Sequence, residues 1–288
     1  MSDKSYALSV VGTLETFFEY GCNIFATGYQ PRSDLWQAFN ACTETLYTGA
    51  DAITLAHGME ECDYRQNLWI SRGQIEKHGL SLKDSHNSFG FLVSAPDPEL
   101  EYMDSKKFTP YHLIYNIENL EGLTPQPPIA SLINLDFSLS QIIENSQIPI
   151  KFGGEFPAYF YKNDEYILIQ PQDTFKSIHD YQCVILHELI HATGHRNRLN
   201  RFSWGLSDKD TLYAQEELTT GLAMVILSHK LGFKITDPKH ESHIKSWLYV
   251  LNNEYDLIVK ACNDAFVACD YIIDNWLQYI KKFLNFIT

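Results

Sequence analysis

The chain has 288 residues, of which 45% are hydrophobic, 14% aromatic and 20% charged, so it can bury one large core or two modest ones, and disordered, collagen-like and mini-protein classes are excluded. Its 22 basic and 36 acidic residues give a net charge of −14, which argues against a duplex-DNA-binding protein that relies on a broad basic surface. None of the six cysteines belongs to a C-x-x-C pair, so neither a thiol-rich zinc site nor a disulfide framework is expected.

The N-terminal segment is apolar from Ala7 to Leu14, but Glu15 and Glu19 soon interrupt it. It lacks the small-residue cleavage pattern of a signal peptide. Nowhere does the chain contain an uninterrupted apolar run of about 18 residues, the minimum for a membrane-spanning helix. We therefore expect a protein of the reducing cytoplasm that has no membrane partner.

The first half of the chain predicts a mixture of helices and strands. Residues 34 to 47 place apolar side chains at roughly helical spacing and predict a helix capped by Ser33 or Asp34. A shorter helix is predicted between Ser71 and Gly79, because glycine favours a helix end. Aromatic and β-branched residues predict strands at Phe89–Ser94 and Tyr111–Ile117.

The clearest break in the chain is Gly122-Leu-Thr-Pro-Gln-Pro-Pro128, because its three prolines cannot continue a helix or a central strand. We place a domain boundary there, which gives domains of residues 1–125 and 126–288. The first domain has 8 basic and 17 acidic residues and a net charge of −9. The second has 14 basic and 19 acidic residues, so both domains are acidic.

The second half begins with a predicted β-hairpin, since Ala158–Tyr161 and Tyr166–Ile169 flank the turn residues Asn163 and Asp164. Apolar residues surround most of the segment from Tyr181 to Thr193, which predicts a helix buried in a core. Further helices are predicted at Tyr213–Leu231, at His243–Leu257 and from Ile258 to about Phe286. Together these elements predict a two-domain protein of the α+β class.

The most specific feature is His187-Glu188-Leu189-Ile190-His191, an H-E-x-x-H motif inside the buried helical segment. Histidines at i and i+4 lie one turn apart on the same face, so both can bind one tetrahedral Zn²⁺. Glu188 follows the first ligand, where a carboxylate can take a proton from metal-bound water and pass it to a leaving amine. Gly194 is expected to end the helix. The alternative, two hydrogen-bonded core histidines, would bury polar groups at high cost without a metal.

A catalytic zinc site needs a third protein ligand, with water in the fourth position. Position 197 is Asn, so the pattern H-E-x-x-H-x-x-G-x-x-H is absent. We expect Glu217 as the third ligand, since Thr220 and Gly221 lie one turn further on and would let its helix approach the first. Glu216 is the alternative ligand; otherwise it is a surface charge or supports a ligand. This donor set would also accept Mn²⁺ or another divalent ion.

Three further features near the motif have two interpretations each. His195 is expected in a structural or ligand-supporting role, with substrate contact as the alternative. Tyr213 is either a buried structural residue or the donor of a hydrogen bond in the transition state. The strand at Tyr166–Gln170 is either an ordinary core strand or the sheet edge that pairs with an extended peptide substrate.

Several motifs extend beyond the metal-binding segment. They are H-E-L-x-H-x-T-G-H followed by R-L-N-R between His187 and Arg201, together with Asn67–Gln74, Tyr115–Leu123, Phe152–Gly154, Tyr213–Leu218 and Ser246–Leu251. With these motifs the chain resembles, over nearly its whole length, the ArdC-like antirestriction proteins. The resemblance implies an N-terminal α+β domain that binds single-stranded DNA, followed by a zincin-like metallopeptidase domain with an H-E-x-x-H helix and a small β-sheet. It also implies a plasmid- or phage-associated protein that shields incoming DNA from host restriction.

A binding site for single-stranded DNA combines a basic track with aromatic side chains on which bases stack. The candidates are Trp69, Arg72 and Lys77, which are close in sequence, and also Arg65, Trp36 and Phe91, of which the last two are more typical of a core. The acidic first domain suggests an alternative, because it could imitate DNA phosphates and bind a basic groove on a host nuclease.

These observations predict a zinc metallopeptidase with Glu188 as general base, acting on host restriction enzymes or other proteins that act on DNA. One alternative is a non-proteolytic inhibitor whose metal is structural and which protects by occupying DNA or a nuclease surface. A second alternative is a peptidase that clears proteins crosslinked to DNA.

Overall fold

The computed structural model describes residues 3–19, 34–83, 88–94, 111–123, 139–154, 158–161, 164–201, 209–235, 237 and 239–276. The described residues up to 123 form one compact unit, and those from 139 onward form a second. Both units combine helices with a small sheet, which confirms the predicted α+β class. The predicted boundary between residues 125 and 126 lies outside the described residues and stays a prediction.

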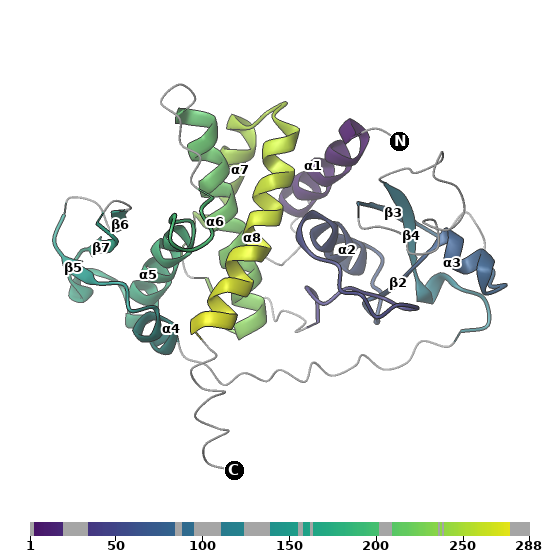
Figure 1. The fold of residues 1–288 in the computed structure, drawn as a ribbon, viewed down its shortest axis with the longest axis horizontal. Coiled ribbons are helices and arrows are strands. Elements are labelled where there is room, and N and C mark those ends of the chain that lie inside the picture. Colours follow the sequence, from purple (N-terminus) through teal and green to yellow (C-terminus); the bar gives the residue numbers. More distant parts are fainter. Residues whose placement is uncertain are drawn as a thin grey trace, which may run out of the picture. The chain divides into compact units, whose positions relative to one another are not determined.

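Among its described residues, the first unit combines three α-helices with a four-stranded sheet (Figure 1). Its elements are α1 (Asp3–Glu19), β1 (Phe39–Asn40), α2 (Gly49–Glu61), β2 (Leu68–Ser71), α3 (Arg72–Lys77), β3 (Gly90–Val93), β4 (His112–Asn116) and the 3₁₀ helix η2 (Ile117–Asn119). The strand order is β1-β2-β4-β3, with β1 and β2 parallel and the other pairs antiparallel. The two predicted strands and the predicted short helix of this half are confirmed.

The core of the first unit forms where α1 and α2 pack together. Tyr6, Val10 and Leu14 repeat at helical spacing on α1 and are all buried. The Tyr6 hydroxyl donates a hydrogen bond to Asp51 of α2, and the same carboxylate accepts the backbone N–H of Ser94 after β3. The buried carboxylate of Asp51 on α2 thus connects this helix both to α1 and to the end of β3.

Residues 34–47 do not form the predicted helix. They form β1 with turns around it, and β1 pairs with β2. The side chain of Asn40 accepts hydrogen bonds from the backbone N–H groups of Cys42 and Thr43, which closes the turn that follows. Asparagine competes with helical hydrogen bonds in this way, and pairing with a distant strand decides the outcome.

The second unit joins five described α-helices to a three-stranded sheet. Its elements are α4 (Leu139–Ser146), β5 (Ile150–Phe152), β6 (Ala158–Tyr161), β7 (Tyr166–Ile169), the 3₁₀ helix η3 (Gln172–Thr174), α5 (Ile178–Thr193), α6 (Lys209–Leu231), α7 (His240–Val250) and α8 (Tyr255–Trp276). The sheet order is β5-β7-β6, with β5 parallel and β6 antiparallel to β7. Figure 1 shows this sheet beside α5, with α6, α7 and α8 packed beyond it.

The predicted hairpin and the predicted buried helix are confirmed by β6, β7 and α5. Because β7 lies between β5 and β6, it is a core strand, and the interpretation of β7 as the sheet edge is wrong. Helix α7 ends before the predicted Leu257, since the chain turns through Asn253 in the left-handed region (φ 72°). The last helix is confirmed as far as Trp276, and its predicted continuation lies outside the described residues.

No helix in the described part of the chain is both long enough and apolar enough to cross a membrane.

Candidate metal centre

Helix α5 carries the H-E-x-x-H motif and is held in place by its capped start and its buried side chains. The hydroxyl of Ser177 caps its start by accepting the backbone N–H of Asp180, and the helix ends at Gly194 as predicted. Several apolar side chains of α5 are almost fully buried: Ile185, Leu186, Leu189, Ile190 and Ala192. The burial of these residues fixes the rotation of the helix, so His187 and His191 share the face that meets α6.

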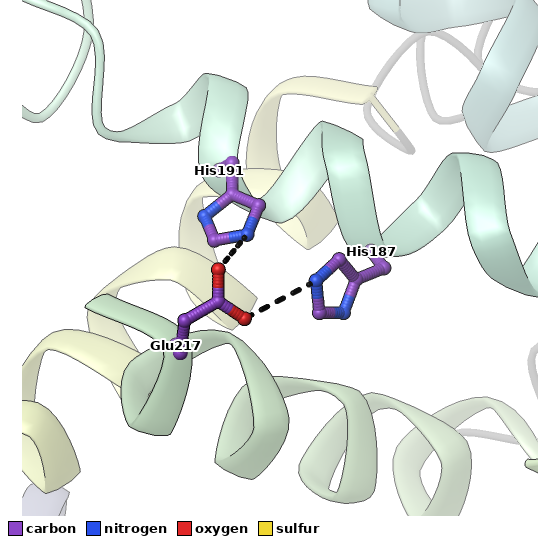
Figure 2. Close-up of side chains that lie close together, drawn as sticks. All are labelled: His187, His191 and Glu217. Atoms are coloured by element: carbon purple, nitrogen blue, oxygen red, sulfur yellow. Dashed lines mark ion pairs between the residues drawn. The ribbon is translucent and has the colours of Figure 1, made fainter. Parts of the chain in front are cut away.

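Two histidines of α5 and one glutamate of α6 point toward one another (Figure 2). The ligand atoms of His187, His191 and Glu217 all lie within 4.8 Å of one another. The carboxylate of Glu217 faces both rings, with Oε1 3.5 Å from Nε2 of His191 and Oε2 3.8 Å from Nε2 of His187. Two imidazole nitrogens and a carboxylate oxygen are the donor set of a Glu-type zinc site, so these residues fit a divalent metal ion.

Glu216 lies behind His191 instead of in the ligand cluster. Its Oε1 is 3.0 Å from Nδ1 of His191, the ring nitrogen opposite the one that faces Glu217. Arg201 bonds both carboxylate oxygens of Glu216, at 2.7 and 2.9 Å, and the Thr220 hydroxyl lies 3.1 Å from the same Nδ1. Glu216 therefore has the position of a residue that orients a metal-binding histidine.

The electrostatics of the cluster favour a cation. Burial lowers the pKa of His191, but its hydrogen bonds to Glu216 and Glu217 and their charges outweigh burial and raise this pKa to about 10. Burial raises the pKa of Glu217, but the hydrogen bond and charge of His191 outweigh burial and lower this pKa to about 2. Burial also raises the pKa of Glu216, and Arg201 and His191 bring it below its ordinary value. Desolvation, with His191 beside it, lowers the pKa of His187 to about 3. Two ionised carboxylates thus stabilise a positive charge at this point, which a divalent ion can supply.

Glu188 connects α5 to the neighbouring sheet. Its side chain is buried, and its carboxylate accepts a hydrogen bond from the backbone N–H of Phe160 in β6. Burial raises the pKa of Glu188; the charge of His191 offsets part of this rise, and the charge of Glu217 adds to it. A carboxyl group with a raised pKa, next to a metal ligand, suits a general base.

His195 connects the segment after α5 to the β-hairpin. It is buried, and its Nδ1 lies 2.7 Å from Oε1 of Glu165, the residue that forms the turn between β6 and β7. Arg198 binds the other oxygen of Glu165 at 3.1 Å. These contacts place His195 in a structural position that ties the sheet to the metal helix.

Tyr213 is not a buried structural residue, because its side chain is 40% exposed. Its hydroxyl is hydrogen-bonded to Glu217, and its ring packs edge-on against Trp247 of α7 at 5.5 Å between centroids. The tyrosine therefore stands at the rim of the ligand cluster.

Thr220 and Gly221 were both predicted to let α6 approach α5, but they face different helices. Thr220 contacts α5 through its hydroxyl, whereas Gly221 makes room for α7, since a Cβ there would lie 2.9 Å from Cγ1 of Ile244. Arg201, the partner of Glu216, was not predicted as a residue of the site. The indication available in the sequence was a cation in the segment between the H-E-x-x-H motif and the acidic pair.

Trp69 does not offer a surface for stacking bases. It is fully buried in the first unit, its indole N–H donates to Asn67, and its ring packs edge-on against Phe91. Trp36 is also buried, at 5% exposure. The sheet pairing that encloses Trp69 joins segments far apart in sequence, so its burial could not be inferred from its neighbours in the chain.

The basic candidates lie on the surface. Arg65, Arg72 and Lys77 are all exposed. Arg72 forms an ion pair with Glu76 at 3.2 Å. Arg72 and Lys77 are five positions apart on α3, so their side chains leave the helix in different directions.

Residues 138–264 match the MPTase-PolyVal family of zincin-like metallopeptidases. This segment includes α5 and α6 and therefore all three residues of the ligand cluster. Over this segment the chain is similar to zincin-like metallopeptidases.

Crystal structures of the antirestriction protein ArdC from plasmid R388 share the fold of the chain. The metal-free structure aligns with a TM-score of 0.63 and 24% identity, covering 95% of this chain and 98% of ArdC. The Mn(II)-bound structure aligns with a TM-score of 0.66 and 23% identity, covering 94% and 97%. At this identity the likeness shows the fold.

The chain is also similar to two DNA primases, both named TraC, from Escherichia coli. The identities are 29% over 164 residues and 28% over 163 residues, each covering 56% of this chain. The chain spans only 11% and 15% of the length of these primases. An uncharacterized protein of Sinorhizobium fredii, y4eC, is 26% identical over 246 residues, which cover 81% of this chain and 80% of that protein.

Proposed function

We propose that this protein is an ArdC-like antirestriction protein that hydrolyses peptide bonds in proteins acting on DNA, and so protects incoming plasmid or phage DNA from host restriction. The observation that carries the peptidase assignment is the convergence of His187, His191 and Glu217, with the buried Glu188 beside them. The shared fold with ArdC supports the antirestriction role, and the similarity to the TraC primases supports a connection with DNA.

In this proposal His187, His191 and Glu217 hold the divalent ion, which is Zn²⁺ or, by analogy with Mn(II)-bound ArdC, Mn²⁺. When bound, the metal polarises the substrate carbonyl and makes a water more acidic. Glu188 takes the proton of the attacking water and delivers it to the leaving amine. Tyr213, whose side chain is exposed at the rim of the ligand cluster, is proposed to exchange its hydrogen bond with Glu217 for one donated to the carbonyl oxygen as negative charge develops.

The substrate chain is proposed to lie along β6. The backbone N–H of Phe160 bonds Glu188 and therefore points away from β7, and Ala158 presents its backbone groups on the same side. No described strand pairs with this side of β6. An extended peptide that adds to this edge would pass directly beside the proposed base.

We also propose single-stranded DNA as a partner of the first unit, with the exposed cations Arg65, Arg72 and Lys77 contacting phosphates. Trp69 is left out of this proposal because it is fully buried. Binding to DNA would bring the peptidase domain to the proteins that act there.

The peptidase proposal is tested by Glu188→Gln. We expect the purified variant to retain its metal, measured by elemental analysis, because Glu188 is not in the ligand cluster. Cleavage of a restriction endonuclease bound to its DNA site, followed by mass spectrometry, should fall by a factor of about 10² to 10⁴. His187→Ala should lose both metal and cleavage, whereas the exposed Glu144→Gln is the matched control and should lose neither.

The same variants distinguish protection by proteolysis from protection by occupying DNA or a nuclease surface. If cells producing Glu188→Gln protect transformed plasmid DNA from restriction as well as cells producing the wild type, the proteolytic account is wrong. The non-proteolytic alternative, with a structural metal, would then explain the protection.

A further inference from the structure

The turn between β6 and β7 carries an acidic residue whose partners all come from the segment after the metal helix. Glu165 lies in this turn in the left-handed region (φ 52°). Nδ1 of His195 lies 2.7 Å from its Oε1, and Nδ2 of Asn197 donates to the same oxygen at 2.8 Å. Nη1 of Arg198 donates to its Oε2 at 3.1 Å. Because an ionised carboxylate only accepts hydrogen bonds, the proton of His195 in this pair sits on Nδ1.

The segment that supplies these donors is itself fixed to the end of α5. Nε of Arg198 donates to the backbone carbonyl of Ala192 at 2.6 Å, and the backbone N–H of Leu199 donates to the carbonyl of Thr193 at 3.0 Å. A cation is favourable at this end of a helix, because the last carbonyl groups have no partner within the helix. The guanidinium of Arg198 therefore joins the helix that carries the metal ligands to Glu165.

The sheet is thus attached to α5 at two ends. At one end β7 continues through η3 into the start of α5, so this attachment is covalent. At the other end Glu165 attaches the turn to the C-terminal half of α5, the half that carries His187 and His191. The strands between these ends have only three or four residues each, and strands this short have little stability of their own. The position of β6 beside the metal ligands therefore depends on the contacts of the turn.

The position of β6 matters because the proposed reaction uses this strand twice. The backbone N–H of Phe160 bonds the carboxylate of Glu188, the proposed general base. The same side of β6, at Ala158 and Phe160, is the edge on which the substrate chain is proposed to lie. A misplacement of about 1 Å in a group that positions a substrate can slow catalysis by about 10²-fold.

We propose that Glu165 is a positioning residue of the peptidase site. By binding His195, Asn197 and Arg198 it fixes β6 relative to the metal helix, and it thereby determines where the backbone of the substrate lies. This inference rests on the proposed function. It gives a role to the residues that follow the H-E-x-x-H motif, which the proposed chemistry does not use.

The test compares the binding of two hydroxamates to the Zn²⁺-loaded full chain by NMR titration. Acetohydroxamate contacts only the metal, whereas tri-alanine hydroxamate also offers a peptide backbone to the edge of β6. We expect Glu165→Ala to weaken binding of tri-alanine hydroxamate by about tenfold, the effect of losing one or two backbone hydrogen bonds, and to leave acetohydroxamate binding unchanged. Asp173→Ala is the matched control, since Asp173 is an exposed acidic residue of η3, and it should bind both compounds as the wild type does.

Amide hydrogen exchange separates positioning from a general loss of stability. In Glu165→Ala the amides of β6 and β7 should exchange about tenfold faster, because hydrogen bonds to a charged group are lost, while those of α8 keep their wild-type rates. Arg198→Ala removes the other side of the same contact and should accelerate the same amides, with little further effect in the double variant. Glu165→Gln keeps the shape and one acceptor oxygen, so it should give the same changes at a smaller size.

The outcomes distinguish this inference from the proposed function. If Glu165→Ala binds tri-alanine hydroxamate as the wild type does, or if α8 exchanges faster to the same extent as β6 and β7, Glu165 is not a positioning residue and the proposed function stands. If the wild type binds tri-alanine hydroxamate no more tightly than acetohydroxamate, the proposed substrate edge on β6 is wrong. If the wild type binds neither compound, the proposed metal site itself is wrong.

Discussion

Glu216 and Glu217 are adjacent in sequence but have different tasks, because a helix rotates by about 100° per residue. Glu217 faces both Nε2 atoms of the histidine pair, whereas Glu216 lies between Arg201 and the far nitrogen of His191. The carboxylate of Glu216 therefore serves two partners at once. It neutralises a buried guanidinium and it orients a histidine.

Glu216→Gln should damage both stability and metal binding. The variant leaves the buried Arg201 without its counter-charge, so the free energy of unfolding of the metal-free protein should fall by roughly 3 kcal/mol in urea denaturation. Zn²⁺ affinity should fall by about 10- to 100-fold, because His191 loses its charged partner. Glu241→Gln removes an exposed ion pair with Lys245 and should change stability by less than about 0.5 kcal/mol. Equal effects from the two variants would show that Glu216 contributes no more to stability or metal binding than an exposed ion-pair partner does.

The residues of the site could be predicted where their relation is local. His187 and His191 are four positions apart on one helix, so their shared face follows from helix geometry alone. The preference for Glu217 over Glu216 was based on Thr220 and Gly221 as the small residues that face α5, but Thr220 contacts the same His191 nitrogen as Glu216, and Gly221 faces α7. Trp69 was misassigned because its burial comes from strand pairing between distant segments, which one stretch of sequence does not encode.

An element could be predicted from the sequence where residues within or next to it determine its structure. The helix α3 was predicted correctly because Ser71 and Gln74 form a capping box and Gly79 ends the segment in the left-handed region, all within nine residues. The segment 34–47 was predicted wrongly because its apolar spacing suits a helix as well as a buried strand with turns. Pairing with β2 and the hydrogen bonds of Asn40 decide in favour of the strand.

Gly221→Ala should destabilise the packing of α7 on α6. The added Cβ would lie 2.9 Å from Cγ1 of Ile244, and such overpacking costs about 1 to 3 kcal/mol. The gain in helix propensity, about 1 kcal/mol, offsets only part of this cost. We therefore expect a net loss of about 1 kcal/mol in thermal or urea unfolding.

A double-mutant comparison identifies the cause. In the Ile244→Ala background, Gly221→Ala should become neutral or stabilising, because the clashing carbon is gone. Gly12→Ala in α1 is the matched control, since a Cβ at Gly12 meets nothing within 4 Å, and it should stabilise the protein. A loss that persists in the Ile244→Ala background would assign the effect to another contact.

At the scale of the whole molecule, the charge of −14 limits how the protein can bind DNA. Only 8 basic residues precede residue 126, against 17 acidic ones, so any phosphate-binding surface of the first unit must be local. Binding would depend on a few cations and would weaken steeply with salt, because each phosphate contact releases counterions. The alternative, an acidic surface that binds a basic nuclease groove, needs no such cations.

A variant that combines Arg72→Ala with Lys77→Ala tests this local surface. Both side chains are exposed, so stability should change by no more than about 0.5 kcal/mol per substitution. If both contact phosphates, the dependence of log affinity on log salt concentration should become shallower by about 1.4, or about 0.7 per contact with a single strand. Fluorescence anisotropy of a labelled oligothymidine at several salt concentrations measures this slope, with the exposed Lys245→Ala and Lys260→Ala as the control pair. An unchanged slope would show that α3 is not part of the DNA-binding surface. If the same variant still protected DNA from restriction, the result would favour binding of a nuclease by the acidic surface of the first unit.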